Sequence, residues 1–516
     1  MKFNRTLLFT SGLFLSVSLI AVATLVDGCK SNTNKAFVPT GDTIADGKVL
    51  VQKNCTRCHA LVPVDALTKD VWVVHTLPAM AGFFSIKTYG IDYYKEKEDT
   101  TGMSLSEWQT IVSYYKKAAP DSLTPAKRPV ALQNDWAGFV MKKAAPSTDI
   151  CFTTMAAVNG DNIYTGDAVS GNFTEWNQQL KVTRVTQLPS PAVHADFIKD
   201  SSGVTKAIVS AIGRLDPVDF PNGRVFSVDL SGKSKLQADQ MASDLPRPTQ
   251  TISADFDKDG RNETIVLGQG GQKGGIYLLK PDVDGKTYKQ TTISDRPGAV
   301  QATTGDYNKD GWPDLMVLFG SNNEGLSLLL NDKKGGFTAK DLLSFPPVNG
   351  STSFQLVDID HDGNQDLIYT CGYNFRDSRI LKPYHGLYIF KNTGNFKFEQ
   401  SWFYPINGCS KAIATDFDGD GDLDIATIAF FADMKNTPQE EFIYFEQDKA
   451  MQFKPHAVPV SKNGRWMAME VTDRNHDGKP DIILANYASG FLFQPNFAPN
   501  WDEHTPFIVL ENHTKK

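Results

Sequence analysis

The sequence predicts two folded units in series, a small all-α domain followed by a larger all-β domain. With 516 residues the chain is too long for one ordinary hydrophobic core. Residues 43–120 carry helix-type apolar spacing, whereas from residue 134 onward short apolar runs recur between glycine-containing loops. Residues 121–133 then form the linker. The formal net charge of −7, with acids spread along the chain, gives no indication of a nucleic-acid partner.

Residues 1–29 have the composition of a targeting segment and are set apart from the fold. A positive start precedes an apolar run, Leu7–Val26, that ends near Cys29. The pattern resembles a bacterial lipoprotein signal. It implies lipidation at Cys29, a polar tether over residues 30–42 and a place in the cell envelope, periplasmic or at the cell surface. Asp27 departs from the usual small or apolar residue, and an uncleaved membrane helix is the alternative.

The all-α region opens with a C-x-x-C-H motif formed by Cys55, Cys58 and His59. Two thiols at this spacing are typical of covalent haem attachment, and the adjacent histidine then lies beneath the iron as its proximal ligand. The alternative is a thiol pair followed by a histidine through chance. The flanking segments therefore have to distinguish the two interpretations.

The flanks favour a haem domain. Residues 46–54 predict a short helix, in which Gly47 permits close packing of a second helix. A capping box, Ser104 to Glu107, begins that second helix. Its apolar stripe comprises Leu105, Trp108, Ile111, Val112 and Tyr115. The order of helix, motif, loop and helix resembles class I cytochrome c over about 80 residues (43–120). This resemblance implies one covalent haem c and electron transfer to a redox partner protein.

The second axial ligand of the iron has three candidates. Met80 lies in a Leu-Pro-x-Met segment that resembles that of haem domains fused to repeats, and it is the preferred ligand. Met103 is the rival, although it directly abuts the helix cap at Ser104. His75 is the third candidate, and core packing is the alternative for all three. Methionine and histidine together would fill both axial positions, which indicates an electron carrier.

The all-β region contains five copies of the pattern D-x-[DN]-x-D-G-x-x-[DE]. Their first residues are separated by 51, 52, 58 and 57 residues. The residues at positions one, three, five and nine are Asp255, Asp257, Asp259, Glu263; Asp306, Asn308, Asp310, Asp314; Asp358, Asp360, Asp362, Asp366; Asp416, Asp418, Asp420, Asp424; and Asp473, Asn475, Asp477, Asp481. A degraded sixth copy begins at Asp196.

This spacing matches the chemistry of Ca²⁺, which takes six to eight oxygen ligands in a flexible cage. Alternate residues of a tight loop point their carboxylates inward, and glycine at position six permits the sharp turn. The sequence therefore predicts about five Ca²⁺ ions, whereas a cage made of protein alone disfavours Mg²⁺. Ordinary Asp/Gly turns without metal are the alternative. The runs that follow the loops, such as Ile482 to Leu484, predict buried strands.

Each repeat ends in a strand, turn and strand, and residues 507–512 supply one more strand. The whole resembles FG-GAP (VCBS-type) repeats of integrin-like proteins over about 370 residues (134–516). The resemblance implies a β-propeller, with four strands to a blade. The five loops, the copy at Asp196 and a stretch from Cys151 to Gln187 predict seven blades, with six or eight as alternatives.

Turn segments ahead of several loops suggest a ligand site at one mouth of the propeller channel. His194, Arg247, Arg296 and Arg465 would form a basic collar there for an anionic or sugar ligand. Hydrogen bonding between blades by these turn residues is the alternative. Cys371 and Cys409 fall in adjacent repeats, so either a disulfide or buried thiols are expected.

Two functions are consistent with this organisation. The first is a membrane-attached electron carrier whose propeller docks a partner protein or a glycan. The second is an enzyme whose propeller oxidises a small substrate, such as a sugar, and passes electrons to its own haem. The sequence shows no nucleophile–base arrangement and no G-x-G-x-x-G fingerprint, so the enzyme assignment stays open.

Overall fold

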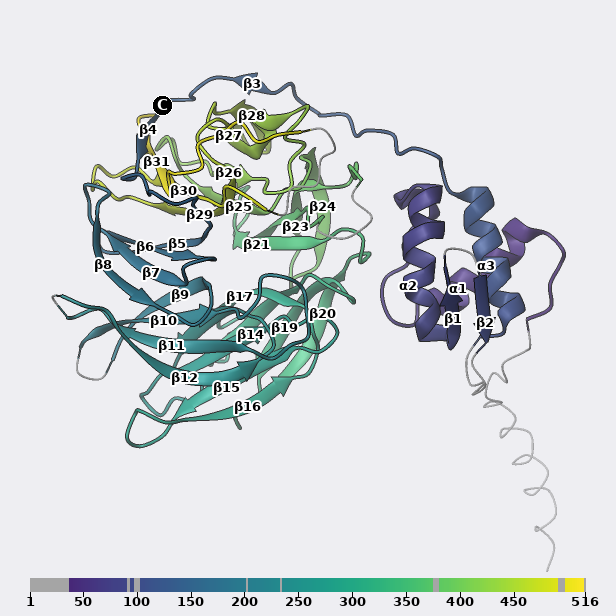
Figure 1. The fold of residues 1–516 in the computed structure, drawn as a ribbon, viewed down its shortest axis with the longest axis horizontal. Coiled ribbons are helices and arrows are strands. Elements are labelled where there is room, and N and C mark those ends of the chain that lie inside the picture. Colours follow the sequence, from purple (N-terminus) through teal and green to yellow (C-terminus); the bar gives the residue numbers. More distant parts are fainter. Residues whose placement is uncertain are drawn as a thin grey trace, which may run out of the picture.

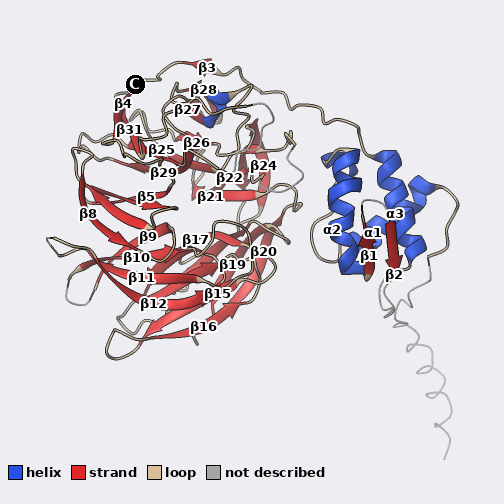
Figure 2. Cartoon of the chain, viewed as in Figure 1, coloured by secondary structure: helices blue, strands red, loops and turns tan. Residues whose placement is uncertain are grey.

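The computed structural model describes residues 37–90, 93–96, 103–200, 203–232, 234–374, 380–490 and 497–514. The targeting segment, Cys29 and the first part of the tether lie outside these residues. Most helices lie in the N-terminal part and most strands in the remainder, which also contains the helical turn η4 (Pro438–Glu441) (Figure 2). None of the helices described is both long and apolar enough to cross a bilayer.

The N-terminal unit contains helices and one β-hairpin. The helices are α1 (Thr43–Cys55), α2 (Leu77–Ala81) and α3 (Leu105–Ala118), with short helical turns η1 (Val64–Ala66), η2 (Val71–Thr76) and η3 (Gly82–Phe84) between α1 and the hairpin. The hairpin pairs β1 (Ile86–Tyr89) with β2 (Tyr93–Glu96). The prediction of an all-α unit is therefore wrong at this point, because Ile86 and Tyr94 turn one face of the hairpin into the core.

Helices α1 and α3 pack against each other at Gly47. A Cβ atom added to Gly47 would lie 2.2 Å from the Cβ of Tyr114, so only glycine allows this approach. The capping box at the start of α3 is present, with the Ser104 hydroxyl accepting from the backbone N–H of Glu107. Trp108 and Ile111 are 1 % and 0 % exposed, which confirms the predicted apolar stripe.

Replacing Gly47 by alanine is expected to destabilise the helical unit by about 1–3 kcal/mol. Alanine normally stabilises a helix by up to about 1 kcal/mol over glycine, but the collision with Tyr114 outweighs that gain. Thermal unfolding followed by the helical circular dichroism signal measures the change. Lys48→Ala, an exposed change in the same helix, is the control. An equal or higher melting temperature for Gly47→Ala contradicts the prediction.

The remainder of the described chain forms a seven-bladed β-propeller (Figure 1). Blade 1 contains β5 (Thr153–Asn159), β6 (Asn162–Asp167), β7 (Asn172–Trp176) and β8 (Val182–Gln187). Blade 2 contains β9 (Ala192–Lys199), β10 (Thr205–Ala211), β11 (Gly223–Asp229) and β12 (Gln237–Leu245). Blade 3 contains β13 (Pro248–Ala254), β14 (Glu263–Gly268), β15 (Gly275–Pro281) and β16 (Tyr288–Ser294).

Blades 4 to 7 follow the same order. Blade 4 contains β17 (Ala299–Gly305), β18 (Asp314–Phe319), β19 (Gly325–Asn331) and β20 (Phe337–Ser344). Blade 5 contains β21 (Ser351–Val357), β22 (Asp366–Cys371), β23 (Gly386–Asn392) and β24 (Phe398–Pro405). Blade 6 contains β25 (Lys411–Thr415), β26 (Asp424–Ile428), β27 (Phe442–Lys449) and β28 (Gln452–Ala457). Blade 7 contains β29 (Trp466–Thr472), β30 (Asp481–Asn486) and β31 (Phe507–Asn512).

The N-terminal side of the propeller sequence closes the ring. Strand β4 (Phe139–Lys143) pairs antiparallel with β31 and is the outer strand of blade 7. Strand β3 (Gln133–Asn134) adds to the edge of β28 in blade 6. Both ends of the propeller chain therefore meet in the last two blades, which leaves the ring without an unpaired gap between its ends.

The first strand of each blade lies innermost, and glutamine amides join several of these strands. The Gln250 side chain donates to Ala302 O (3.1 Å) and accepts from Ala302 N (2.7 Å) in the next blade. Gln301 makes the same pair of bonds with Phe354. Each amide thus satisfies backbone groups on the free edge of the neighbouring inner strand.

A buried carboxylate seals the junction between blades 4 and 5. Glu324 is 1 % exposed and accepts from the N–H groups of Gly350 and Ser351 and from the Ser351 hydroxyl. Burial raises the pKa of Glu324 to about 7, although these hydrogen bonds oppose the shift. The folded protein therefore holds a proton here at pH values where the unfolded chain has lost it.

Stability is expected to fall by up to about 3 kcal/mol as the pH rises from about 4.5 to about 7, through Glu324 alone. In this window the unfolded state binds fewer protons than the folded state, so the free energy of unfolding decreases. Denaturant unfolding of Glu324→Gln should show a correspondingly flatter pH profile. Glu399→Gln, at an exposed position, is the control and should keep the wild-type slope. Parallel profiles for the wild type and Glu324→Gln contradict the prediction.

The helical unit rests on blade 5. The Tyr384 hydroxyl donates to Ala66 O at 3.1 Å, and Val348 and Ile380 pack against the helical core. The linker is also held to the propeller, because Arg128 pairs with Glu440. The two units are therefore in direct contact as well as joined by the linker.

Candidate functional site

The C-x-x-C-H motif lies at the C-terminal end of α1. Cys55 is the last residue of the helix and borders the helical core, whereas Cys58 is exposed. His59 is half-buried, and its Nδ1 lies 2.7 Å from Ala60 O. If Nδ1 donates this bond, the tautomer leaves Nε2 as an unprotonated nitrogen, which is the form that binds a metal. The motif thus presents two thiols and one imidazole nitrogen on a short segment.

The three candidates for the second axial ligand lie at different depths. Met80, on α2, is half-buried and packs against the helical core. Met103 is 9 % exposed and belongs to that core, next to the cap of α3. His75 is the last residue but one of η2 and is half-buried. The Met80 thioether is the more accessible of the two methionines, so it remains our predicted ligand.

The core offers one further feature that fits a bound haem. The indole N–H of Trp108 is buried and has no hydrogen-bond partner in the part of the chain described. Buried donors without partners are costly, and a haem has acceptor groups. The donor set of thiols, imidazole and thioether is also the usual one for haem c. The residues present therefore fit this group.

The five acidic loops share one backbone conformation. In the first loop, Asp255 accepts from the N–H groups of Asp259 and Gly260, both at 3.0 Å. Positions four and six have positive φ, and glycine relieves the strain at position six. The position-four residues are Lys258 (φ 59°), Lys309 (60°), His361 (60°), Gly419 (78°) and His476 (61°). The shared pattern of residues thus corresponds to a shared fold of the loop.

The acid at position nine has a structural role that the sequence did not indicate. In blade 4, Asp314 accepts from Tyr307 N in its own loop and from Asn331 N at the end of the third strand. Asp424 likewise accepts from Phe417 N and Gln447 N, and burial raises its pKa to about 7. Both carboxyl groups are almost fully buried, and each fastens its own loop, in blade 4 or blade 6, to the third strand of that blade.

Three loops bring carboxylate oxygens within 4.8 Å of one another. These groups are Asp255, Asp257 and Asp259; Asp358, Asp360 and Asp366; and Asp416, Asp418 and Asp424. The other two loops have Asn308 and Asn475 at position three. Amide oxygens are also Ca²⁺ ligands, so all five loops retain oxygen donors at these positions.

Electrostatics at the loops favour a cation. Lys280 forms an ion pair with Asp257, and Lys391 forms one with Asp360, so a positive group already lies against these carboxylates. The buried oxygens without a hydrogen-bond partner in the described chain include Glu263 Oε1, Asp360 Oδ1 and Asp481 Oδ2. A bound cation would stabilise these oxygens in their ionised form. The residues therefore fit the predicted Ca²⁺.

Neighbouring blades clamp two of these loops. The Asn331 side chain in blade 4 donates to Phe256 O, in the loop of blade 3. Asn512 in blade 7 donates to Phe417 O, in the loop of blade 6. These two hydrogen bonds connect the conformation of the loops with the packing between blades. No sequence pattern within one repeat indicates it.

The three arginines of the predicted basic collar donate hydrogen bonds to other groups of the protein. Arg247 donates to Leu215 O (2.9 Å) and Gln269 Oε1 (2.7 Å), and Arg465 donates to Phe430 O (3.0 Å). Arg296 donates to Asn323 O and Asp341. Burial lowers the pKa of His194 to about 4, which leaves this ring neutral at physiological pH. These observations favour the alternative of hydrogen bonding by turn residues at blade junctions over a ligand collar.

Cys151, Cys371 and Cys409 are buried free thiols in the structure. Burial raises the pKa of Cys371 to about 12, so this thiol stays protonated. The arrangement agrees with the buried-thiol alternative for Cys371 and Cys409.

Comparison with known proteins supports the repeats. Residues 255–317 and 316–369 match the FG-GAP-like repeat family. No curated protein matches the sequence. Similar solved structures include the crystal structure of the N-terminal domain of Nup159 (12 % identity, 75 % of this chain and 100 % of that chain, TM-score 0.41). Virginiamycin B lyase from Staphylococcus aureus is similar at 11 % identity (72 % and 98 % covered, TM-score 0.44).

Proposed function

We propose that the protein is an exported, membrane-attached c-type cytochrome whose calcium-binding propeller is a docking module. The single observation that carries the redox part is the C-x-x-C-H motif, placed at the end of α1 with His59 Nδ1 directed at a backbone carbonyl. A haem held by Cys55, Cys58 and His59 supplies one-electron exchange, and Met80 is the proposed second axial ligand. Lipidation at Cys29 would keep the protein at the membrane.

The docking role of the propeller is supported by its architecture. The seven blades form a closed ring that includes two FG-GAP-like repeats, and the helical unit contacts blade 5. Five acidic loops are proposed to hold Ca²⁺ and to stiffen the ring through their links to the third strands. A rigid ring of this kind presents loops for a partner protein or a glycan.

The proposal is tested by producing the full chain in a bacterial host that can mature c-type cytochromes. Denaturing gel electrophoresis followed by haem staining should show haem that stays with the polypeptide. Absence of covalently retained haem under these conditions would overturn the redox assignment. The same preparation, mixed with candidate sugars, should leave the haem α-band unchanged. Sugar-dependent haem reduction would instead favour an oxidoreductase.

A further inference from the structure

Side chains with ionisable groups fill several junctions between blades, at either of two recurring positions. The first position immediately precedes the inner strand of a blade, where Arg247 and Arg465 donate to carbonyls of the preceding blade. The second immediately precedes the third strand, where Glu324 and Glu441 accept from the next inner strand. Each arrangement fills the space between two blades with a buried, hydrogen-bonded side chain that carries an ionisable group.

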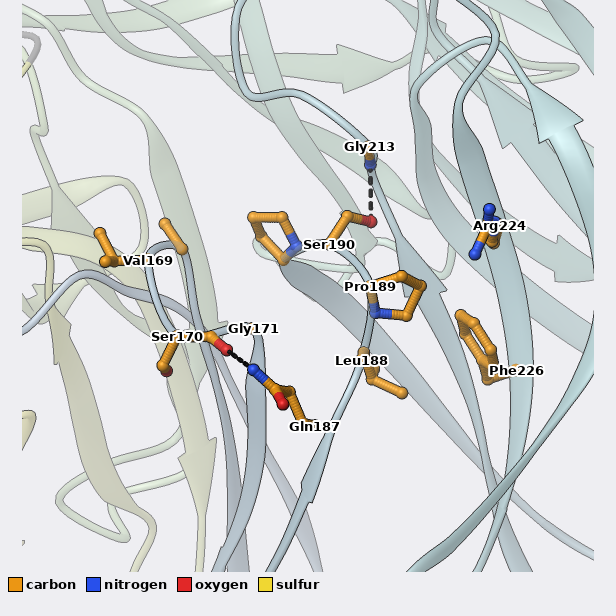
Figure 3. A pocket seen from close by; sticks show the side chains of 12 residues that line it. Val169, Ser170, Gly171, Gln187, Leu188, Pro189, Ser190, Gly213, Arg224 and Phe226 are labelled. Atoms are coloured by element: carbon orange, nitrogen blue, oxygen red, sulfur yellow. Dashed lines mark hydrogen bonds between the residues drawn. The ribbon is translucent and has the colours of Figure 1, made fainter.

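The junction between blades 1 and 2 is one of those that have neither arrangement. Gly171 precedes the third strand β7, and Pro191 precedes the inner strand β9. Gly171 has a φ of 68°, and a Cβ atom there would lie 2.5 Å from Leu188 O, so a larger residue is disfavoured. Pro191 has no side-chain donor. Both residues line an open pocket of about 690 Å³ at this junction (Figure 3).

The pocket contains one charged side chain among its lining residues, Arg224 of β11. Arg224 is half-buried, and its guanidinium has no hydrogen bond or ion pair with the residues that the structure describes. Two other polar side chains of the pocket form hydrogen bonds within the protein: Ser190 Oγ accepts from Gly213 N, and the Gln187 side chain donates to Ser170 O (Figure 3). Pro189 and the exposed Val169 supply apolar surface.

Strand register indicates what this space accommodates at other junctions. The backbone N–H of Ser351, the first residue of inner strand β21, donates to Glu324, and that of Trp466 in β29 donates to Glu441. Ala192 is the corresponding first residue of β9, as its pairing with the last residue of β10 shows. At two junctions a glutamate carboxyl group accepts from this N–H group, whereas at the junction between blades 1 and 2 the corresponding residue is Gly171, which has no carboxyl group.

We propose that this pocket binds an organic carboxylate of monosaccharide size, such as a hexuronate. The ligand's carboxylate pairs with Arg224, and its body lies against Pro189 and Val169. The positive charge of Arg224 disfavours cationic ligands. The inference rests on the proposed role of the propeller as a binding module, and it is independent of the haem.

Calorimetric titration of the calcium-loaded full chain tests the site. Galacturonate and N-acetylglutamate are the two carboxylate probes, and glucose is the uncharged probe. At least one of the two carboxylates should bind at one site per chain, and the Arg224→Gln substitution should lower its affinity about tenfold or more. Arg214→Gln, on an adjacent exposed loop where Arg214 pairs with Asp216, is the matched control and should change affinity less than about twofold.

The outcomes separate the alternatives. If galacturonate binds and N-acetylglutamate does not, the ligand is an acidic sugar. If N-acetylglutamate binds and galacturonate does not, the ligand is an acid of the amino-acid type. Binding of neither carboxylate, equal binding of glucose, or unchanged affinity in Arg224→Gln overturns the proposal. Because covalent haem is measured on the same preparation, haem retention without binding contradicts only this inference. Binding without haem contradicts only the redox proposal.

Discussion

Replacing Cys55 and Cys58 together by serine should abolish covalent haem retention completely. Thioether attachment requires a sulfur atom at each position, and serine oxygen does not substitute for it. The measurement is haem staining after denaturing electrophoresis, together with the ratio of haem to protein absorbance. We expect the double variant to lose the stain while the propeller keeps its own unfolding transition, because both cysteines lie in the helical unit.

Cys151→Ser is the matched control, since Cys151 is a thiol in the propeller, outside the motif. It should retain haem at the wild-type level. Covalent haem that persists in the double serine variant would show attachment elsewhere and would refute the assignment. Met80→Ala and Met103→Ala then identify the second axial ligand, because loss of that ligand changes the spectrum and lowers the reduction potential.

Removal of calcium is expected to produce the largest change in propeller stability. A site saturated at one hundred times its Kd stabilises the folded state by about 2.7 kcal/mol, and five loops act in the same ring. Chelation should therefore lower the melting temperature of the propeller transition and leave the haem spectrum intact. Added Mg²⁺ should restore less stability than Ca²⁺, because it demands a more rigid geometry and retains its water.

Asp360→Asn supplies a sharp control for this experiment. Two natural loops already carry asparagine at the same position, Asn308 and Asn475, so the fold tolerates the change. In the presence of chelator, the variant should have the melting temperature of the wild type. On addition of calcium its melting temperature should rise less, because a site with fewer charged ligands binds Ca²⁺ more weakly. Identical melting temperatures with and without chelator would mean that the loops are turns without metal.

Local patterns in the sequence predicted the repeated parts of the fold well. The predicted strand over residues 507–512 is β31 as the structure has it, and the run after Asp366 lies in β22. The capping box at Ser104 and the close approach at Gly47 are also confirmed. These features depend on residues within one turn or one loop, so the relevant interactions are visible in a short stretch of sequence.

The contacts that join distant segments were not predictable in this way. The hairpin β1–β2 interrupts the expected all-α unit, and the pairing of β4 with β31 joins residues more than 360 positions apart. The collar arginines carry the right charge for a ligand, yet Arg247 and Arg465 find carbonyl acceptors only once the blades are packed. A donor's partner depends on which backbone groups come near it, and that depends on the whole ring.

From sequence alone came the prediction of a motif suited to haem, of five loops suited to calcium and of seven blades, and the structure confirms the seven blades. Packing of the complete ring was needed to show that position-nine acids fasten loops to strands and that Arg247 seals a junction. It also showed that Gly171 and Pro191 line a pocket at one junction. The physical reason is that loop and motif geometry follow from local backbone constraints, whereas burial and hydrogen-bond partners follow from contacts between blades.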